Sequence, residues 1–353
     1  MNRTDAALDV ISSLALAGAA ATILIRPRHV AAIARSPLGP GTARLASGAA
    51  RGLLRRLAPQ PQPRGVRKLA WLISRYGASR SVTQTAGRRL NGSAAMLAFS
   101  VLADSAVEHY RGSFQNRAMY TPLLTAALTL GASVFGAADR RAARHPVRDA
   151  IYGVAAATGL AGLCFHAYNI LKRPGELSWL NLFYAAPIGA PMALALAGLL
   201  GRGAEKVRDT PYRRRASIFG VPAGRMLAGV SAAGLAGTVG EAGLLHFRGA
   251  FHNPFMVAPV TIPPVAATLL SAAAGFPGRI INRFARWWLR LTALLGFAGV
   301  GFHAYGISRA MGGWRNWSQN VVDGPPLPAP PSFTGLALAG LAALSLIEEE
   351  RNG

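Results

Sequence analysis

Four of the seven histidines form two pairs with the same internal spacing. His109 precedes His166 by as many positions as His246 precedes His303. We call the displacement along the chain from His109 to His246 the repeat offset; His166 and His303 are separated by the same offset. An imidazole can ligate haem iron or a transition metal, carry a proton, or donate a hydrogen bond to another helix. The duplicated spacing makes all four histidines candidate ligands.

The first histidine of each pair begins a shared segment, "HYRGSFQN" at 109–116 and "HFRGAFHN" at 246–253. Arg111 and Arg248 occupy the same place in these two segments. Arginine forms charge-assisted hydrogen bonds with carboxylates and phosphates. The two arginines are therefore candidates for binding the acidic groups of a cofactor, a lipid headgroup or an anionic substrate. Ordinary snorkelling to the membrane interface is the alternative.

An acidic residue precedes the same histidines by five positions. Asp104 precedes His109, and Glu241 precedes His246. Five residues rotate a helix by about 140°, so that the acid and the histidine do not share a face. These acids are candidates for a proton or cation path, with a helix–helix contact as the alternative. Glu108 has no acidic counterpart in the second segment, which weakens a symmetric two-metal site.

The second histidine of each pair follows two glycines on one helical face. Gly159 and Gly162 precede His166 by seven and four residues, and Gly296 and Gly299 precede His303 in the same way. Small residues at this spacing let a second helix approach closely. They would also let a flat ring lie against the backbone. We therefore expect b-type haem, or otherwise a metal ion, bound within each of two histidine pairs: His109 with His166, and His246 with His303. A pairing across the two copies, His109 with His303, is the alternative.

The composition predicts that these residues lie on membrane-spanning helices. Of 353 residues, 51% are hydrophobic and only 15% are charged, whereas soluble proteins average about 25% charged residues. The apolar residues form blocks long enough to cross a hydrocarbon core about 30 Å thick. We expect an all-α integral membrane protein of about nine helices. The expected spans are 6–25, 92–110, 121–138, 150–171, 185–201, 226–247, 258–275, 288–308 and 331–347.

The positive charge indicates how the helices are oriented. The chain has 38 Lys+Arg against 14 Asp+Glu, a net charge of +24. The connections 139–149, 201–217 and 278–290 are strongly basic and alternate with less basic ones. The positive-inside rule places this basic set in the cytoplasm, in a bacterial-type inner (plasma) membrane with the N-terminus outside and the C-terminus cytoplasmic. Because the charge lies between apolar blocks, we do not expect nucleic-acid binding.

The chain is expected to contain two tandem repeats of four helices, 92–201 and 226–347. Four is an even number, so the repeats should be parallel and related by an axis along the membrane normal. The segment "LALAGL" at 194–199 recurs at 336–341, five positions beyond the repeat offset of the histidines. This shift predicts five extra residues in the last outer loop of the second repeat.

The remaining segments are assigned by their charge. Residues 1–25 are expected to form a leader helix, although a cleaved signal peptide is the alternative. Residues 26–91 contain 14 Lys+Arg and no acid, which predicts a basic cytoplasmic arm on anionic lipid headgroups or docked to a partner subunit. Its expected amphipathic helices are 43–58 and 66–80. A basic linker (202–225) and a C-terminal tail (348–353) complete the chain.

The leading functional hypothesis is a membrane electron-transfer protein with one haem per repeat. A proton- or cation-coupled transporter with its path between the repeats is the alternative. A non-enzymatic anchor or assembly subunit and a membrane metalloenzyme also stay open. The sequence contains no Walker loop, GxSxG or HExxH motif, and no CxxCH motif for covalent haem attachment. The sequence alone leaves open whether the protein is an enzyme.

Overall fold

The computed structural model describes residues 64–210 and 215–352, with side chains from residue 82 onward. The chain divides into two units after Ala78, and all candidate residues belong to the second unit, 79–353. The expected leader helix 1–25 and amphipathic helix 43–58 lie outside the described residues.

Long helices joined by short connections make up the second unit. The connections contain three 3₁₀ turns, η1 (Arg117–Met119), η2 (Pro254–Val257) and η3 (Gly313–Asn316), and two short helices, α7 (Trp179–Tyr184) and α12 (Trp317–Asn320). A two-stranded antiparallel hairpin, β1 (Ser217–Ile218) with β2 (Val221–Pro222), precedes α9. The long helices are α4 (Arg64–Arg111), α5 (Tyr120–Ala138), α6 (Pro146–Leu171), α8 (Gly189–Arg208), α9 (Ala223–Arg248), α10 (Ala258–Gly275), α11 (Arg279–Arg309) and α13 (Pro331–Asn352).

Seven helices in the described part of the chain are long and apolar enough to cross a membrane: α4, α5, α6, α9, α10, α11 and α13. This confirms the prediction of an all-α, multi-pass membrane protein. Helix α8 is not among the seven, since its last two turns carry Arg202, Glu205, Lys206 and Arg208. The expected total of nine spans therefore stays a prediction.

The helices extend further at the basic connections than the hydropathy pattern predicts. Residues 201–208 belong to α8, and residues 279–290 belong to α11. Helix α4 also runs without a break across the expected arm boundary at 91/92. Arg and Lys are good helix formers, and no proline ends these helices at the membrane surface. The 31-residue α11 is thus about 46 Å long at 1.5 Å per residue, well beyond the hydrocarbon thickness.

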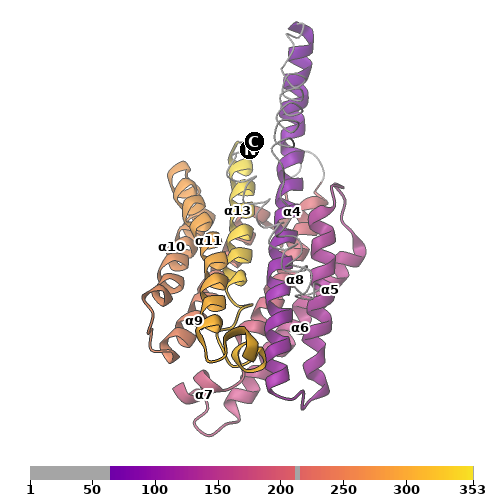
Figure 1. Cartoon of the computed structure of the whole chain (residues 1–353). Coiled ribbons are helices and arrows are strands. Elements are labelled where there is room, and N and C mark those ends of the chain that lie inside the picture. The colour runs from indigo at the N-terminus through magenta and orange to yellow at the C-terminus, as the bar shows by residue number, and fades with distance from the viewer. Residues whose placement is uncertain (1–63, 211–214, 353) are drawn as a thin grey trace, which may run out of the picture. The chain divides into compact units, whose positions relative to one another are not determined.

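We call α4 to α8 the first half and α9 to α13 the second half. Helices α4, α8, α9 and α13 pack where the halves meet (Figure 1). The Ser93 hydroxyl on α4, for example, donates to the Gly335 carbonyl on α13 at 2.5 Å. The apolar window of α13 is 89% buried, against 17% in α6 and 22% in α11. The peripheral helices α6 and α11 therefore present most of their surface outward.

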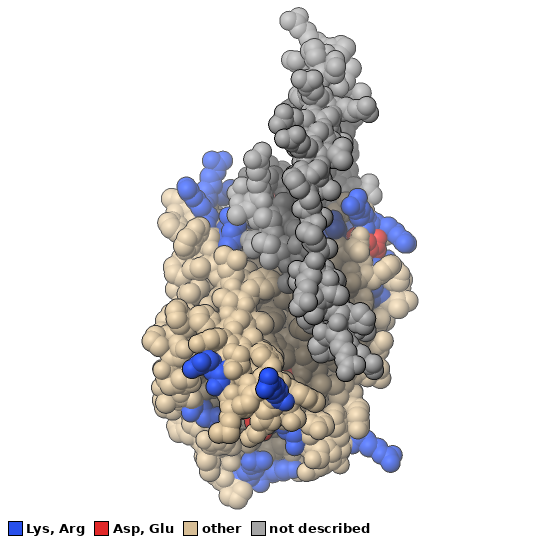
Figure 2. All heavy atoms as spheres, in the orientation of Figure 1, with Lys and Arg blue, Asp and Glu red and all other residues tan. Residues whose placement is uncertain are grey.

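The two ends of the unit differ in their residues. We call the end with connections 139–145 and 276–278 the basic end, and the end that carries His109, His166, His246 and His303 the histidine end. Lys and Arg gather near both ends on the face in Figure 2, with a broad uncharged band between them. Such a band between charged rims is what a bilayer requires.

Candidate functional site

The first histidine of each pair closes the turn that follows its helix. His109 Nδ1 lies 2.7 Å from the Met119 carbonyl. The Phe114 N–H donates to the His109 carbonyl at 3.0 Å, and the Asn116 side chain accepts the Ala118 N–H at 2.9 Å. Phe114 adopts a φ of +46°, which is uncommon for a residue with a side chain. These bonds hold the turn in that conformation.

The same turn occurs in the second half. His246 Nδ1 lies 2.8 Å from the Met256 carbonyl. The Phe251 N–H donates to the His246 carbonyl at 3.0 Å, and Phe251 again has a φ of +46°. Asn253 accepts the Phe255 N–H at 3.0 Å. The recurrence of His, Phe and Asn in the two segments therefore has a structural cause, which the sequence did not reveal.

The second histidine of each pair binds the connection that leads into the last helix of its half. His166 Nδ1 is hydrogen-bonded to the Pro187 carbonyl, and His303 Nδ1 lies 2.7 Å from the Pro326 carbonyl. A carbonyl oxygen only accepts, so that each of the four rings carries its proton on Nδ1. Within the described residues, no hydrogen bond reaches Nε2 of any of the four. A metal-ligating histidine usually has this arrangement, with one nitrogen fixed by a carbonyl and the other available.

The two members of each expected histidine pair lie within range of an electrostatic interaction. His109 and His166 are close enough to interact electrostatically, and so are His246 and His303. In the second half, α10 and α13 each pack against both α9 and α11. Helices α9 and α11 therefore lie diagonally across a four-helix bundle, and His246 and His303 approach each other from opposite corners.

Packing becomes looser at the level of the histidines. Helix α6 has no fully buried residue between Gly159 and Ile170, and α11 has none between Gly296 and Ile307. The buried residues of α9 end at Leu235. Buried positions on a packed helix normally recur every three to four residues, and ten residues correspond to about 15 Å. The histidine end is therefore less closely packed than the basic end.

The glycines that precede the second histidine of each pair let a neighbouring helix approach closely. They do not leave space for a haem ring. A Cβ at Gly159 would lie 2.3 Å from the Ala195 nitrogen, on α8. A Cβ at Gly296 would lie 2.2 Å from Thr334 Oγ1, on α13. Of the two uses expected for this face, close helix approach is the one observed. A haem ring lying against these glycines is excluded, because α8 and α13 occupy the space.

Each of the two arginines contacts the opposite half. Arg111 forms ion pairs with Glu108 at 2.8 Å and with Asp323, in the connection before α13, at 3.4 Å. Arg248 donates to the Phe183 carbonyl at 3.0 Å and lies 5.2 Å from the centroid of the Tyr184 ring. Both arginines therefore tie the halves together at the histidine end, a role that the sequence did not indicate.

Asp104 and Glu241 approach each other from α4 and α9 closely enough to interact electrostatically. Glu241 accepts the Gly189 N–H at the start of α8, where the helix dipole favours a carboxylate. No Lys or Arg in the described part of the chain lies within ion-pair distance of either acid. The two carboxyl groups thus interact across the halves, with no cation at ion-pair distance among the described residues.

The sequence analysis missed a buried charge cluster at the basic end of the first half. Arg148 donates to both carboxylate oxygens of Glu205 at 3.0 Å and to Asp139 at 2.9 Å. Arg208 donates to the Asp139 and Gly136 carbonyls at 2.7 and 2.8 Å. The side chains of Arg148, Glu205 and Arg208 are at most 2% exposed. Acidic residues within otherwise basic segments were the signal available.

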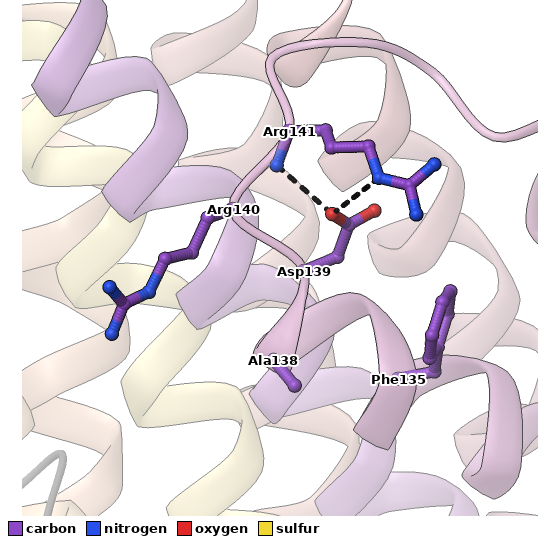
Figure 3. Close-up of a pocket in the computed structure, with 5 residues that line it drawn as sticks. All are labelled: Phe135, Ala138, Asp139, Arg140 and Arg141. Carbon is purple, nitrogen blue, oxygen red and sulfur yellow. Dashed lines mark hydrogen bonds and ion pairs between the residues drawn. The ribbon is translucent and has the colours of Figure 1, made fainter.

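Asp139 lies at the surface edge of this cluster. Together with Phe135, Ala138, Arg140 and Arg141 it lines a shallow, open pocket (Figure 3). Burial favours a higher pKa for the Asp139 carboxyl, but hydrogen bonds from the Arg141 N–H and from Arg148, with the charges of Arg148 and Arg208, hold this pKa below its ordinary value. The carboxylate is therefore ionised at neutral pH and is stabilised by its partners.

The described residues contain no group of three or more His, Cys, Asp or Glu side chains that could hold a metal ion. The expected histidine pairs have two members each and therefore do not meet that number. Comparison with protein-family models, with curated proteins and with solved structures gives no match for this chain. Functional inference therefore depends on the geometry alone.

Proposed function

We propose that this chain is a membrane electron-transfer protein that binds b-type haem through His109 and His166 in the first half and through His246 and His303 in the second. One observation carries the proposal: in each half two imidazoles lie within range of an electrostatic interaction, both with the Nδ1 proton fixed by a backbone carbonyl. The Nε2 lone pairs are then the available ligands. When bound, haem with two histidine ligands supplies a one-electron redox couple.

The chain's own residues would hold such a group in defined ways. The carbonyls of Met119, Pro187, Met256 and Pro326 fix the tautomer and the orientation of the four rings. The looser packing around the histidines fits a cofactor that completes the bundle. The helix faces that carry Gly159 and Gly296 would not contact the haem, because α8 and α13 cover them. Arg111 and Arg248 already have partners within the protein, so that any contact with haem propionates would be shared with those partners.

We further propose that the halves are parallel repeats of four helices. Matching contacts support this: Gly159 packs on Ala195 and Gly296 on Thr334. Gly159 and Gly296 are related by the repeat offset, whereas Thr334 lies two positions beyond the offset from Ala195. The "LALAGL" match, at five positions beyond the offset, is therefore displaced from the packing register by three residues, close to one helical turn. The extra residues in the last outer loop would then number two, not five.

The proposed orientation places the basic end in the cytoplasm and the histidine end outside an inner membrane. Single cysteines introduced at Arg140 and at Asn253, in a Cys164→Ser background, should be labelled by a membrane-impermeant thiol reagent from opposite sides. Labelling of Arg140→Cys in intact cells would overturn this orientation.

The haem proposal is tested on the purified full-length protein by its optical spectrum and by pyridine haemochrome quantification. We expect a Soret band and two haems per chain. His166→Ala and His303→Ala should each remove one haem, and the double variant should remove both.

His252→Ala is the matched control, because the exposed His252 bonds only to the nearby Gly249 carbonyl. It should retain both haems. A folded wild-type protein with no Soret band after expression with haem supplementation would overturn the proposal. The histidines would then serve only to close the connecting loops.

Proton- or cation-coupled transport is a second candidate, and one specific observation favours it. Asp104 and Glu241 adjoin each other between the halves without a cationic partner, and acids within a membrane usually pair or carry ions. Replacing both by Asn and Gln should then abolish ion flux in proteoliposomes while leaving the haem content unchanged. Unchanged flux in the double variant would contradict this candidate.

A further inference from the structure

Helix α5 carries a file of buried hydroxyl groups through the first half. Thr125, Thr129 and Ser133 are 6%, 0% and 0% exposed. Residues four apart lie on one face of a helix, and each step along the axis is about 6 Å. The file therefore extends over about 12 Å inside the protein, less than half of a hydrocarbon core about 30 Å thick.

At the basic end, the file meets a polar pair on two other helices. The Tyr152 hydroxyl on α6 donates to Asn91 Oδ1 on α4, and Asn91 Nδ2 donates to the Gly87 carbonyl at 2.9 Å. Ser133 Oγ adjoins the Tyr152 hydroxyl but is fully buried without a hydrogen bond of normal geometry. A buried polar group usually has a protein or water partner. Ser133 therefore marks a place where a water molecule can complete the network.

Both ends of the file lead to acids. Beyond Tyr152 lie Glu205 and Asp139, and Asp139 lines the open pocket at the basic end (Figure 3). At the other end, Ala126 next to Thr125 shares an apolar cluster with Val101 on α4. Asp104 follows Val101 by three residues, toward the histidine end of α4.

The second half has no such file. The positions that follow Thr125, Thr129 and Ser133 by the repeat offset are Ile262, Ala266 and Leu270. Those that correspond to Asn91 and Tyr152 are Ala228 and Leu289, both fully buried in the apolar core. The same helix arrangement thus packs without these hydroxyls, so that packing alone does not require them.

We infer that the first half carries a path for protons between the pocket at Asp139 and the carboxyl group of Asp104. A proton enters by forming an O–H bond on a carboxylate at the basic end. It moves along hydroxyls and bound water as each O–H bond breaks and the next one forms, and it leaves when the Asp104 O–H bond breaks. The path should exclude metal cations, because its hydroxyls are at most 6% exposed. The inference goes beyond electron transfer and does not depend on haem.

The test uses purified full-length protein in liposomes that contain a trapped pH-sensitive dye, with a potassium gradient and valinomycin to set the potential. Wild-type protein should acidify or alkalise the lumen well above protein-free liposomes, according to the sign of the potential. Thr129→Ala and Ser133→Ala should each lower this proton flux at least tenfold. Thr129→Ser keeps the hydroxyl and should keep the flux.

Thr268→Ala is the matched control. Thr268 on α10 is exposed, and its hydroxyl donates to the carbonyl four residues earlier, so that its loss should leave proton flux unchanged. Wild-type flux equal to that of empty liposomes would overturn the inference. Equal flux in wild type and Ser133→Ala, with both proteins folded by circular dichroism, would overturn it too, as would sodium flux that the same variants block.

Discussion

The two halves solve the same packing problem differently at the basic end. The first half buries Arg148, Glu205 and Arg208 there. At the positions that the proposed repeat matches to these, in the register of the glycine contacts, α11 and α13 bury Ala285, Leu344 and Ile347. In both halves the side chains at these positions are almost completely buried. Under the proposed repeat, the same helix arrangement packs in the second half without these charges.

Side chains next to the charge cluster also differ between the halves, and the total side-chain volume at these positions is similar. In the first half Gly136 makes room for Asn91, since a Cβ at Gly136 would lie 2.3 Å from Asn91 Oδ1. In the second half the corresponding residues are Ala273 and Ala228, both fully buried. A glycine–asparagine pair is thus replaced by two alanines. Such paired changes are expected where close packing is maintained.

Removing one member of the charge cluster should have the largest effect. Arg148→Ala leaves Glu205 buried without its main partner, and breaking a buried ion pair costs about 3 to 5 kcal/mol. The free energy of unfolding, measured by denaturant titration in detergent, should fall by that amount. Arg202→Ala, at an exposed position on the same helix as Glu205, should cost much less. Equal costs would show that the cluster is not effectively buried.

Glycine substitutions test the close helix contact that both halves share at Gly159 and Gly296. Gly159→Ala and Gly296→Ala would each force a Cβ into contact with α8 or α13, and overpacking of this kind costs about 1 to 3 kcal/mol. The two losses in unfolding free energy should be similar. Gly301→Ala is the control, because no atom lies within 4 Å of its added Cβ. A loss at one glycine but not at the other would break the proposed equivalence of the halves.

Converting the first half to the second tests whether the charges stabilise the fold. The triple variant Arg148→Ala, Glu205→Leu and Arg208→Ile removes both signs of charge together. Buried ion pairs replaced by apolar side chains are often neutral in stability. We therefore expect the triple variant to lose less than Arg148→Ala alone, about 1 kcal/mol or less. A loss equal to the sum of three large single effects would show that the cluster is a net stabilising feature.

Periodicity and charge were sufficient to predict the helices but not their ends. Each expected span from 92 onward overlaps a described helix, because apolar blocks of membrane length leave few alternatives. Their ends were missed at α8 and α11, since basic residues continue a helix beyond the bilayer. The "LALAGL" match and the contacts of Gly159 and Gly296 imply registers that differ by three residues. A sequence match between Ala/Leu/Gly-rich helices does not decide between such registers.

The site was predictable in its residues and not in their bonds. Duplicated spacing identified His109 and His246, yet a spacing does not reveal that Nδ1 binds a carbonyl ten residues later. The glycine faces were open to two uses, and the sequence did not decide between them. The Arg148–Glu205 pair was missed because it joins two residues that lie far apart in the sequence. Long-range pairing of charges has no periodic signature.

Acidification should produce the smallest effect, and only in the first half. The partners of Asp139 hold its pKa below the ordinary value of about 3.9. Its ionised form therefore contributes stability that is fully present above the unfolded pKa and is lost as pH falls through the lower, folded pKa. Unfolding free energies measured between pH 6 and pH 3 should decline more steeply for wild type than for Asp139→Asn. Asp209→Asn, at an exposed position of the same end, should retain the wild-type slope. Identical slopes for wild type and Asp139→Asn would mean that the carboxylate at the pocket edge is not stabilised by Arg148, and the charge cluster would then end at Glu205.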